Sequence, residues 1–428
     1  LRRQRQMCIR DSYCSYWTVK IDTVAPTTTI ALSGILGENS WYTSNVEVIL
    51  TATDASPSSG GLTINYYVDS GSWTTYTVPF TITTEGAHTV YYRTTDSAGN
   101  IESTKTQEVK IDKTAPTATS IAINGGDAYT NTESVTLTVS VSDATSTVWK
   151  MSCKNEAAGT WSDWIDYATT IAWSISTGSD GLRTVYFKVK DYAGLVSDPV
   201  AYDTITLDKT APTTTDNAPT GWDNQLPNII NLTSWDSGSG VAHTYYKKWL
   251  STATEPTSYT EGTTVIIDSD GKWYIKYYSV DNAGNAEGAK SIEVWKDSTP
   301  PTTTDNAPTG WQTTTVTVTL TATDVTSGVA YTYYKKWLIT DTEPTSYTAG
   351  TTVTITDDGK WYVKYYSVDT ATNAETAHTV EVWLDMISPT SAVNPISPYW
   401  QTTVPFTITA TASDTGSGVK NVTLWYRY

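Results

Sequence analysis

A motif of the form Asp-x-x-x-Pro returns at nearly constant intervals along this chain of 428 residues. It reads DTVAPTTT at 22–29, DKTAPTAT at 112–119, DKTAPTTT at 208–215, DSTPPTTT at 297–304 and DMISPTSA at 385–392. The prolines of successive copies, Pro26, Pro116, Pro212, Pro301 and Pro389, are 90, 96, 89 and 88 residues apart. A fixed period predicts one structural unit repeated in tandem rather than a single large core.

Each interval contains the same order of short, alternating segments. Examples are VTVTLTATD (316–324), GVAYTYYKKW (328–337), KWYVKYYSVD (360–369) and HTVEVWLD (378–385). Thr, Val, Tyr and Trp suit a pleated, half-buried surface, and six or seven such strands per repeat are typical of an Ig-like sandwich. The sequence therefore predicts an all-β chain, a tandem array of Ig-like or fibronectin-III-like antiparallel β-sandwiches.

The repeat boundaries follow from the motif. We predict an end of a preceding repeat at 13–22, four whole repeats at 23–112, 113–208, 209–297 and 298–385, and a truncated fifth at 386–428. Residues 1–12 differ in composition, and MCIRDS is one reading frame of a DNA sequence that resembles a transposon-end adaptor. We interpret this segment as a cloning or assembly scar, with a basic nucleic-acid-binding arm as the alternative. The missing initiator Met and leader suggest an internal fragment.

Alternation assigns a direction to the side chains of the fourth repeat. Trp361, Val363 and Tyr365 are expected to face the core, as are Val316, Val318, Leu320 and Ala322. The same phase places Tyr334, Tyr362 and Tyr366 on the outer face, where their rings could stack on sugars. The simpler interpretation is that they form cross-strand pairs that stabilise an exposed sheet.

A second recurring motif, Asp-x-Ala-Gly-Asn, follows the Tyr-rich strand. It reads DSAGN at 96–100, DYAGL at 191–195, DNAGN at 281–285 and DTATN at 369–373. Gly and Asn at these places predict a tight turn into the last strand. Because Thr372 replaces the glycine in the fourth copy, we expect that turn to depart from the others.

These residues resemble the tandem Ig-like repeats of bacterial surface and secreted proteins, including the repeats of a leptospiral outer-membrane protein family. The carriers are DKTAPTTT, LTATDVTSGVAYTYY, YYVDSGSWTTYTVPFTITTEGAHTVYYRTTDSAGN and the Asp-Gly-Lys-Trp-Tyr turns, and the resemblance extends from about residue 20 to 428. It implies extracellular display, with adhesion or spacing as the role. It transfers no catalytic residue.

Catalytic patterns are absent from the sequence. The three histidines, His88, His243 and His378, fall in three different repeats. No Gly-x-Ser-x-Gly, His-Glu-x-x-His or phosphate-binding glycine loop occurs. Cys8, Cys14 and Cys153 provide no disulfide framework and no Cys-x-x-Cys pair. We therefore predict that the chain is not an enzyme, and we assign no catalytic or cofactor-binding residue.

Carboxylates gather where two loops and the entering linker meet at one end of each predicted sandwich. The candidate groups are Asp22, Asp54 and Asp96; Asp208, Asp236 and Asp281; and Asp297, Asp324 and Asp369. Three carboxylates are suitable ligands for Ca²⁺. The simpler interpretation, on which we assign no metal ligand and no cofactor, is that each Asp accepts hydrogen bonds from the amides of its own turn.

The acidity of the chain limits its partners. The formal net charge is −17, and it becomes −20 without residues 1–12, which carry +4 −1 = +3. Such a charge disfavours nucleic acid and anionic membranes. We expect an extracellular or cell-surface location, a monomeric rod without membrane insertion, and an extracellular protein or glycan ligand.

Two functions fit these features. The first is a non-catalytic extracellular stalk or adhesion region of a large bacterial surface or secreted protein. The alternative is an accessory, carbohydrate-binding region of a large secreted hydrolase or protease whose catalytic domain is not in this fragment.

Overall fold

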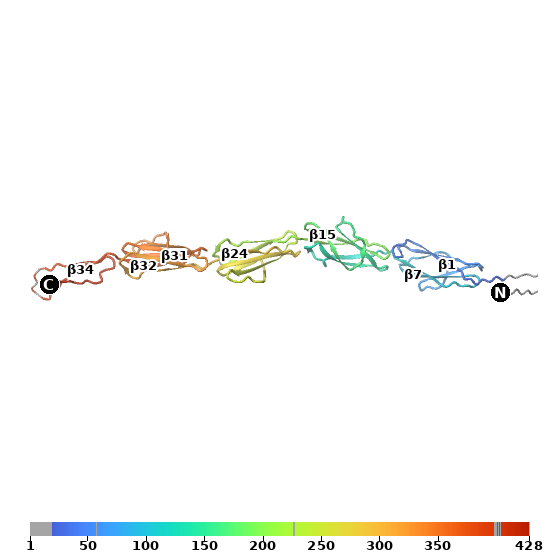
Figure 1. Cartoon of the computed structure of the whole chain (residues 1–428), viewed down its shortest axis with the longest axis horizontal. Coiled ribbons are helices and arrows are strands. Elements are labelled where there is room, and N and C mark those ends of the chain that lie inside the picture. The colour runs from blue at the N-terminus through green and yellow to red at the C-terminus, as the bar shows by residue number, and fades with distance from the viewer. Residues whose placement is uncertain are drawn as a thin grey trace, which may run out of the picture. The chain divides into compact units, whose positions relative to one another are not determined.

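The computed structural model describes residues 19–427 except 57, 226, 398, 399, 401 and 403. The segment interpreted as a scar, residues 13–18, Cys8 and Cys14 lie outside the described residues. The described residues form strands and no helix (Figure 1). They divide into two compact units, Leu1–Thr210 and Ala211–Tyr428, and each is treated by itself.

The first unit contains two pairs of sheets, each pair made of a three-stranded and a five-stranded sheet. In the first pair the orders are β1-β3-β6 and β2-β8-β7-β4-β5. The strands are β1 (Thr27–Ser33), β2 (Trp41–Tyr42), β3 (Val46–Thr53), β4 (Thr63–Val68), β5 (Thr74–Thr75), β6 (Phe80–Ile82), β7 (Gly86–Thr95) and β8 (Lys105–Ile111).

The second pair repeats this plan with the orders β14-β11-β9 and β10-β16-β15-β12-β13. Its strands are β9 (Thr117–Ile123), β10 (Tyr129–Thr130), β11 (Ser134–Ser142), β12 (Val148–Asn155), β13 (Ile165–Asp166), β14 (Thr170–Ser174), β15 (Gly181–Asp191) and β16 (Ala201–Leu207).

The second unit contains two further pairs and one small sheet. The third pair has the orders β17-β19-β22 and β18-β24-β23-β20-β21, and the fourth has β25-β27-β30 and β26-β32-β31-β28-β29. The strands of the third pair are β17 (Thr213–Asp216), β18 (Trp222–Asp223), β19 (Asn228–Trp235), β20 (Val241–Leu250), β21 (Thr260–Glu261), β22 (Thr264–Ile267), β23 (Gly271–Asp281) and β24 (Lys290–Lys296). Those of the fourth are β25 (Thr302–Asp305), β26 (Trp311–Gln312), β27 (Val316–Thr323), β28 (Val329–Leu338), β29 (Thr348–Ala349), β30 (Thr352–Ile355), β31 (Gly359–Asp369) and β32 (His378–Leu384). In the predicted fifth repeat, β33 (Thr390–Val393) pairs with β34 (Ala410–Ser413).

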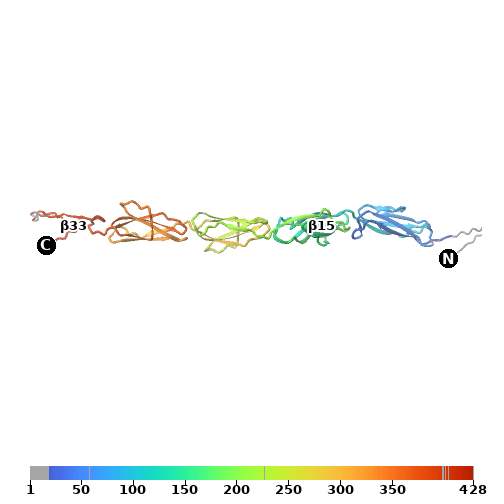
Figure 2. The same cartoon turned by 90° about the horizontal axis from the view of Figure 1, so that it is seen from above.

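The core of each pair lies between its two sheets, and Figure 2 shows the strands of the pairs from a second direction. In the fourth pair, Val318 of β27 and Val363 of β31 are fully buried and belong to one apolar cluster. Val316, Leu320 and Tyr365 join them, whereas alternate threonines of β27 are exposed. The predicted inward phase of both strands is confirmed, because period-2 alternation places every second side chain on the same face.

A two-residue strand extends each five-stranded sheet in the parallel direction. Trp311 of β26 lies opposite Trp383 of β32, and Trp222 of β18 lies opposite Trp295 of β24. The sequence predicted only antiparallel pairing. β26 lies between β25 and β27 in the chain, but it leaves their sheet and joins the edge of the five-stranded sheet, where it runs in the same direction as β32.

A buried polar network connects the two sheets of the fourth pair. Thr303 of β25 shares a hydrogen bond of 2.6 Å with Ser367 of β31, whose hydroxyl also lies 2.8 Å from Thr332 of β28. Glu375 receives the Thr303 amide at 3.0 Å and the Ser367 amide at 2.7 Å. Polar atoms at this interface are therefore paired rather than replaced by apolar packing.

The predicted outward direction of Tyr334 is wrong. Tyr334 lies opposite the buried Tyr365 and packs against the core cluster. A β-bulge between Val329 and Tyr331 inserts one residue into β28. One extra residue reverses the face of every later side chain, so the outward residue is Tyr333.

Candidate functional site

The Asp-x-Ala-Gly-Asn motif forms the turn that follows the longest strand of each five-stranded sheet. In the third pair, Asp281 ends β23, and its Oδ1 accepts the Asn285 amide at 2.8 Å. Its Oδ2 accepts the side-chain Nδ2 of Asn285, also at 2.8 Å. Gly284 has φ +90° and donates its amide to the Asp281 carbonyl at 3.3 Å. The Asp therefore caps its own turn, as the simpler interpretation predicts.

The fourth copy of the turn has the same geometry, contrary to the expectation for Thr372. Thr372 has φ +74°, and its amide bonds to the Asp369 carbonyl at 3.2 Å. Asn373 donates its amide and its Nδ2 to the two oxygens of Asp369, each at 2.8 Å. The paired Asp and Asn hold the turn although a β-branched residue replaces glycine.

In two of the predicted acidic groups, all three residues belong to the same unit. In Asp22, Asp54 and Asp96, and in Asp297, Asp324 and Asp369, one oxygen from each residue lies within 4.8 Å of the others. Turn amides occupy these carboxylates: Asp324 accepts Thr326 and Gly328 at 3.1 and 2.7 Å, and Asp297 accepts Thr299 and Ser327 at 3.0 and 2.9 Å.

The members of the other predicted group belong to different units. Asp208 is in the first unit, where it accepts the Thr210 amide at 3.1 Å. Asp236 is in the second unit and accepts Gly238 at 3.0 Å and Gly240 at 2.8 Å. Each carboxylate again caps the turn that follows it.

A further acidic group, which the sequence analysis did not single out, consists of Asp112, Asp143 and Asp191. One oxygen from each lies within 4.8 Å of the others, and Asp112 and Asp191 are fully buried. Burial, together with the carboxylates of Asp112 and Asp143, raises the pKa of Asp191 to about 6, against the opposing effect of the Leu195 amide. The sequence does distinguish this copy of the motif, because DYAGL has Leu195 where the other copies have Asn.

The three histidines each pair with a different acidic residue. His88 lies 2.9 Å from Asp69, and its Nε2 lies 3.1 Å from the Thr84 hydroxyl, which resembles a nucleophile–base–acid arrangement. However, Nε2 also lies 3.0 Å from the Thr84 carbonyl, an acceptor that requires a proton on Nε2. A nitrogen that donates cannot remove the hydroxyl proton. His243 and His378 pair with Glu261 and Glu375 at 2.7 and 3.4 Å.

Aromatic rings on the outer face of the fourth pair contact one another across strands. Tyr366 stacks on Tyr333 with ring centroids 5.4 Å apart, and Tyr362 lies 5.4 Å from Trp337. Tyr347 meets the edge of Tyr366 at 4.9 Å. These contacts are the cross-strand pairs of the simpler interpretation, and they occupy part of the ring surface that a sugar would need.

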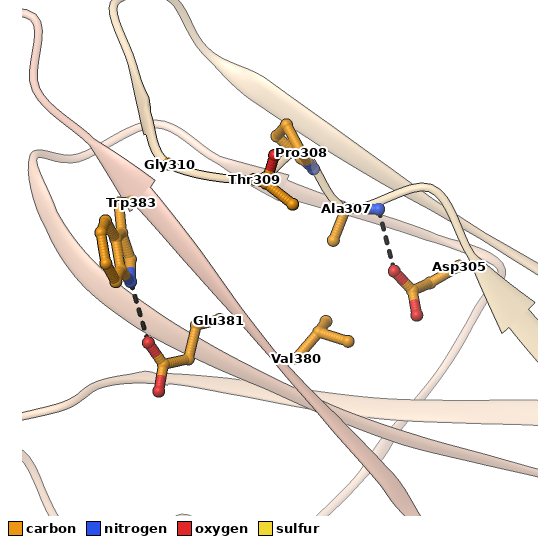
Figure 3. Close-up of a pocket in the computed structure, with 8 residues that line it drawn as sticks. All are labelled: Asp305, Ala307, Pro308, Thr309, Gly310, Val380, Glu381 and Trp383. Carbon is orange, nitrogen blue, oxygen red and sulfur yellow. Dashed lines mark hydrogen bonds between the residues drawn. The ribbon is translucent and has the colours of Figure 1, made fainter.

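An open hollow of about 310 Å³ lies beside β25, β26 and β32, and Figure 3 shows its lining. Asp305 accepts the Ala307 amide at 2.9 Å and the Tyr365 hydroxyl at 2.6 Å. Glu381 accepts the Trp383 indole N–H at 3.0 Å. The lining acids are engaged within the protein, so the hollow has no convergent set of reactive groups.

Cys153 is a buried thiol of the second pair. It is 1% exposed within the core cluster, and burial raises its pKa to about 12. A buried thiol in its neutral form is a small apolar side chain and a poor nucleophile.

Among the described residues, no helix is long and apolar enough to cross a membrane.

No protein-family model matches the chain, and no curated protein matches it. Solved structures of tandem fibronectin-III and Ig domains are similar to it. The fibronectin(III)-like modules of Clostridium thermocellum CbhA are 14% identical over 41% of this chain and 93% of theirs, with a TM-score of 0.27. The FN1-FN3 domains of chicken CNTN1 are 13% identical over 64% and 100%, with a TM-score of 0.25. The N-terminal four Ig domains of Dscam1 isoform 7.44 are 12% identical over 85% and 100%, with a TM-score of 0.24. By its own sheets, this chain is an all-β tandem array of Ig-like and fibronectin-III-like sandwiches.

Proposed function

We propose that the chain is a non-catalytic, extracellular stalk or adhesion region of a large bacterial surface or secreted protein. Its modules would space or present a distal module, or bind an extracellular protein or glycan. The observation that supports this proposal is the repetition of one sandwich, in which the acids of the open hollow and of the Asp281 and Asp369 turns are bonded within the protein. An array of equivalent modules suits reach and display, which need length rather than one reactive centre.

Small-angle scattering of the full chain tests the spacing role. Strands of about nine residues at about 3.4 Å each give roughly 30 Å per module, so four extended modules reach on the order of 120 Å. We expect a maximum dimension of that order that is independent of protein concentration. A compact particle, or one that grows with concentration, contradicts a monomeric spacer.

Surface labelling of cells that carry the parent gene tests the location. An antibody raised against the fourth repeat is expected to stain intact cells or the culture medium. Staining that appears only after the cells are broken contradicts extracellular display.

A further inference from the structure

The acidic group of Asp112, Asp143 and Asp191 has two buried carboxylate oxygens without a hydrogen-bond partner, whereas the group of Asp22, Asp54 and Asp96 has one, Oδ1 of Asp54. Asp112 follows β8, Asp143 follows β11, and Asp191 is the last residue of β15. Asp191 Oδ1 accepts the Leu195 amide at 2.9 Å, but its Oδ2 has no hydrogen-bond partner. Oδ2 of Asp143 also has none. Asp191 is 0% exposed, so bulk water cannot satisfy the orphaned oxygen.

One substitution in the turn explains the orphaned oxygen of Asp191. In the other three copies, Asn100, Asn285 and Asn373 donate Nδ2 to Oδ2 of Asp96, Asp281 and Asp369, each at 2.8 Å. Leu195 occupies the equivalent place in the second copy and has no donor. The repeats thus supply an internal comparison in which the same buried carboxylate has its amide three times and lacks it once.

In the part of the chain that the structure describes, no ion pair or hydrogen bond brings a lysine or arginine to the orphaned oxygen of Asp191. The neighbouring lysines are engaged elsewhere, since Lys190 bonds to Glu38 at 2.8 Å and Lys113 bonds to the Thr83 carbonyl at 2.8 Å. Amides from Thr114 and Ser146 each reach one oxygen of Asp112, at 3.0 and 3.1 Å. Uncompensated buried carboxylates are costly, and each oxygen retains a lone pair for a further partner.

We propose that Asp112, Asp143 and Asp191 form a Ca²⁺ site, in which the cation takes the place that the Asn amide holds in the other turns. The ligand atoms are hard carboxylate oxygens without His or Cys, which favours Ca²⁺ over Zn²⁺. A buried group at strand ends also favours Ca²⁺ over Mg²⁺, because Mg²⁺ retains several waters and demands octahedral geometry. The bound ion connects β8 of the first pair to β11 and β15 of the second, inside one unit.

The test is a CaCl₂ titration of the full chain after chelator treatment, with uptake measured by calorimetry and the unfolding temperature followed in parallel. Leu195→Asn is the decisive variant, because it restores the amide without removing a carboxylate. We expect this variant to bind one ion fewer per chain than the parent, or to bind at this site about tenfold or more weakly, which corresponds to at least about 1.4 kcal/mol. Asp191→Asn is expected to behave in the same way.

The matched control is Asp163→Asn, which removes an exposed carboxylate of the same repeat and should leave both uptake and the unfolding temperature at parental values. Circular dichroism of each variant establishes whether it is folded. If Asp191→Asn does not fold, the comparison of Leu195→Asn with the parent decides the result. Equal uptake by the parent and Leu195→Asn overturns the site. Absence of Ca²⁺ uptake by the parent at about 10 mM, beyond the weakest extracellular modules, also overturns it.

Discussion

At the scale of single residues, Thr372 shows how a turn tolerates an unsuitable side chain. Its φ of +74° lies in the left-handed region, where Gly99, Gly194 and Gly284 of the other turns have φ between +89° and +90°. β-Branched residues are strained there. The Asp369–Asn373 bonds, which are common to the intact motif, hold the turn in place.

Thr372→Gly is therefore expected to raise the free energy of unfolding of the fourth repeat by about 1 kcal/mol. The gain is reduced by the greater flexibility of glycine in the unfolded chain. Urea denaturation of the full chain measures it. Gly284→Thr is the reverse change in the third repeat and should destabilise that repeat by a similar amount. A loss of stability in Thr372→Gly would show that the threonine side chain contributes contacts that outweigh its strain.

The Asp-x-Ala-Gly-Asn turns also show how much of the candidate site the sequence predicts. The turn itself, and the capping by Asp281 and Asp369, follow from local chemistry that Asp, Gly and Asn carry wherever they occur. The prediction that the turn at Thr372 departs from the others was wrong. The low preference of threonine for a positive φ is opposed by two hydrogen bonds from Asn373 to the Asp369 carboxylate. The group of Asp112, Asp143 and Asp191 was not predicted, because its copy of the motif, DYAGL, departs from the others at Leu195.

At the scale of strands and sheets, alternation predicts the inward side chains of β27 and β31, but it cannot locate a bulge. The bulge after Val329 shifts β28 by one residue and turns Tyr334 to the core. It is a feature of pairing between strands, and no local residue pattern marked it. The buried network of Thr303, Ser367 and Glu375 was missed for a related reason, since it joins residues 64 and 72 positions apart.

Thr303→Val tests this network, because valine keeps the shape and removes the hydroxyl. Ser367 and Glu375 then each lose a buried partner, and we expect a loss of about 1–3 kcal/mol in the free energy of unfolding of the fourth repeat. Thr302→Val, at an exposed position on the same strand, is the control and should stay within about 0.5 kcal/mol of the parent. Equal effects of the two substitutions would mean that the network adds nothing to stability.

The first pair has an equivalent network, in which Glu102 accepts the Thr28 amide at 2.9 Å and the Thr28 hydroxyl lies 2.6 Å from that of Thr94. This network makes the stability of the pair depend on pH. Burial alone would raise the pKa of Glu102, but hydrogen bonds from Lys105 and Thr28 outweigh it and hold the pKa below the usual range. A lowered pKa in the folded state contributes stability that is present above the unfolded pKa of about 4.3 and is lost as the pH falls through the folded value.

Acid unfolding of the full chain, followed between pH 6 and 2, is therefore expected to weaken the first repeat below about pH 4.3. Glu102→Gln should be less stable than the parent at pH 6 and should lose less on acidification. Hydrogen exchange of peptides from β1 and β7 separates this repeat from the others. A variant whose stability falls with acid as steeply as the parent's would assign the acid sensitivity to other carboxylates.

At the scale of the whole chain, the four described sandwiches have equivalent strand orders, but each has an apolar core of its own. The second has the most extensive cluster of buried apolar side chains, with Phe187, Met151 and Cys153 at 0–1% exposure. The third has a smaller cluster centred on Ile230, Ile275 and Val294. Since modules of an array have their own intrinsic stabilities, the chain should not unfold in one step.

Hydrogen exchange of the native full chain measures this difference. Amides of β11 and β15 are expected to exchange last, and amides of β19 and β23 earlier, because larger apolar burial raises the free energy of local opening. The exposed strands β33 and β34 serve as a fast-exchanging reference. Simultaneous loss of protection in all four repeats would mean that the chain unfolds as one cooperative block.

The two-residue strands at the margins of the five-stranded sheets have a consequence for assembly. Neighbouring repeats of similar sequence are tethered at high local concentration, where a free strand edge could pair with the wrong module. In the fourth pair, the long strands β28, β31 and β32 all lie inside the sheet, and only β26 and β29 are at its margins. β26 pairs with only two residues of β32, and β29 with only two residues of β28, so the rest of each outer edge has no ladder partner. The short strands therefore shorten, but do not remove, the edges through which two near-duplicate modules could exchange strands.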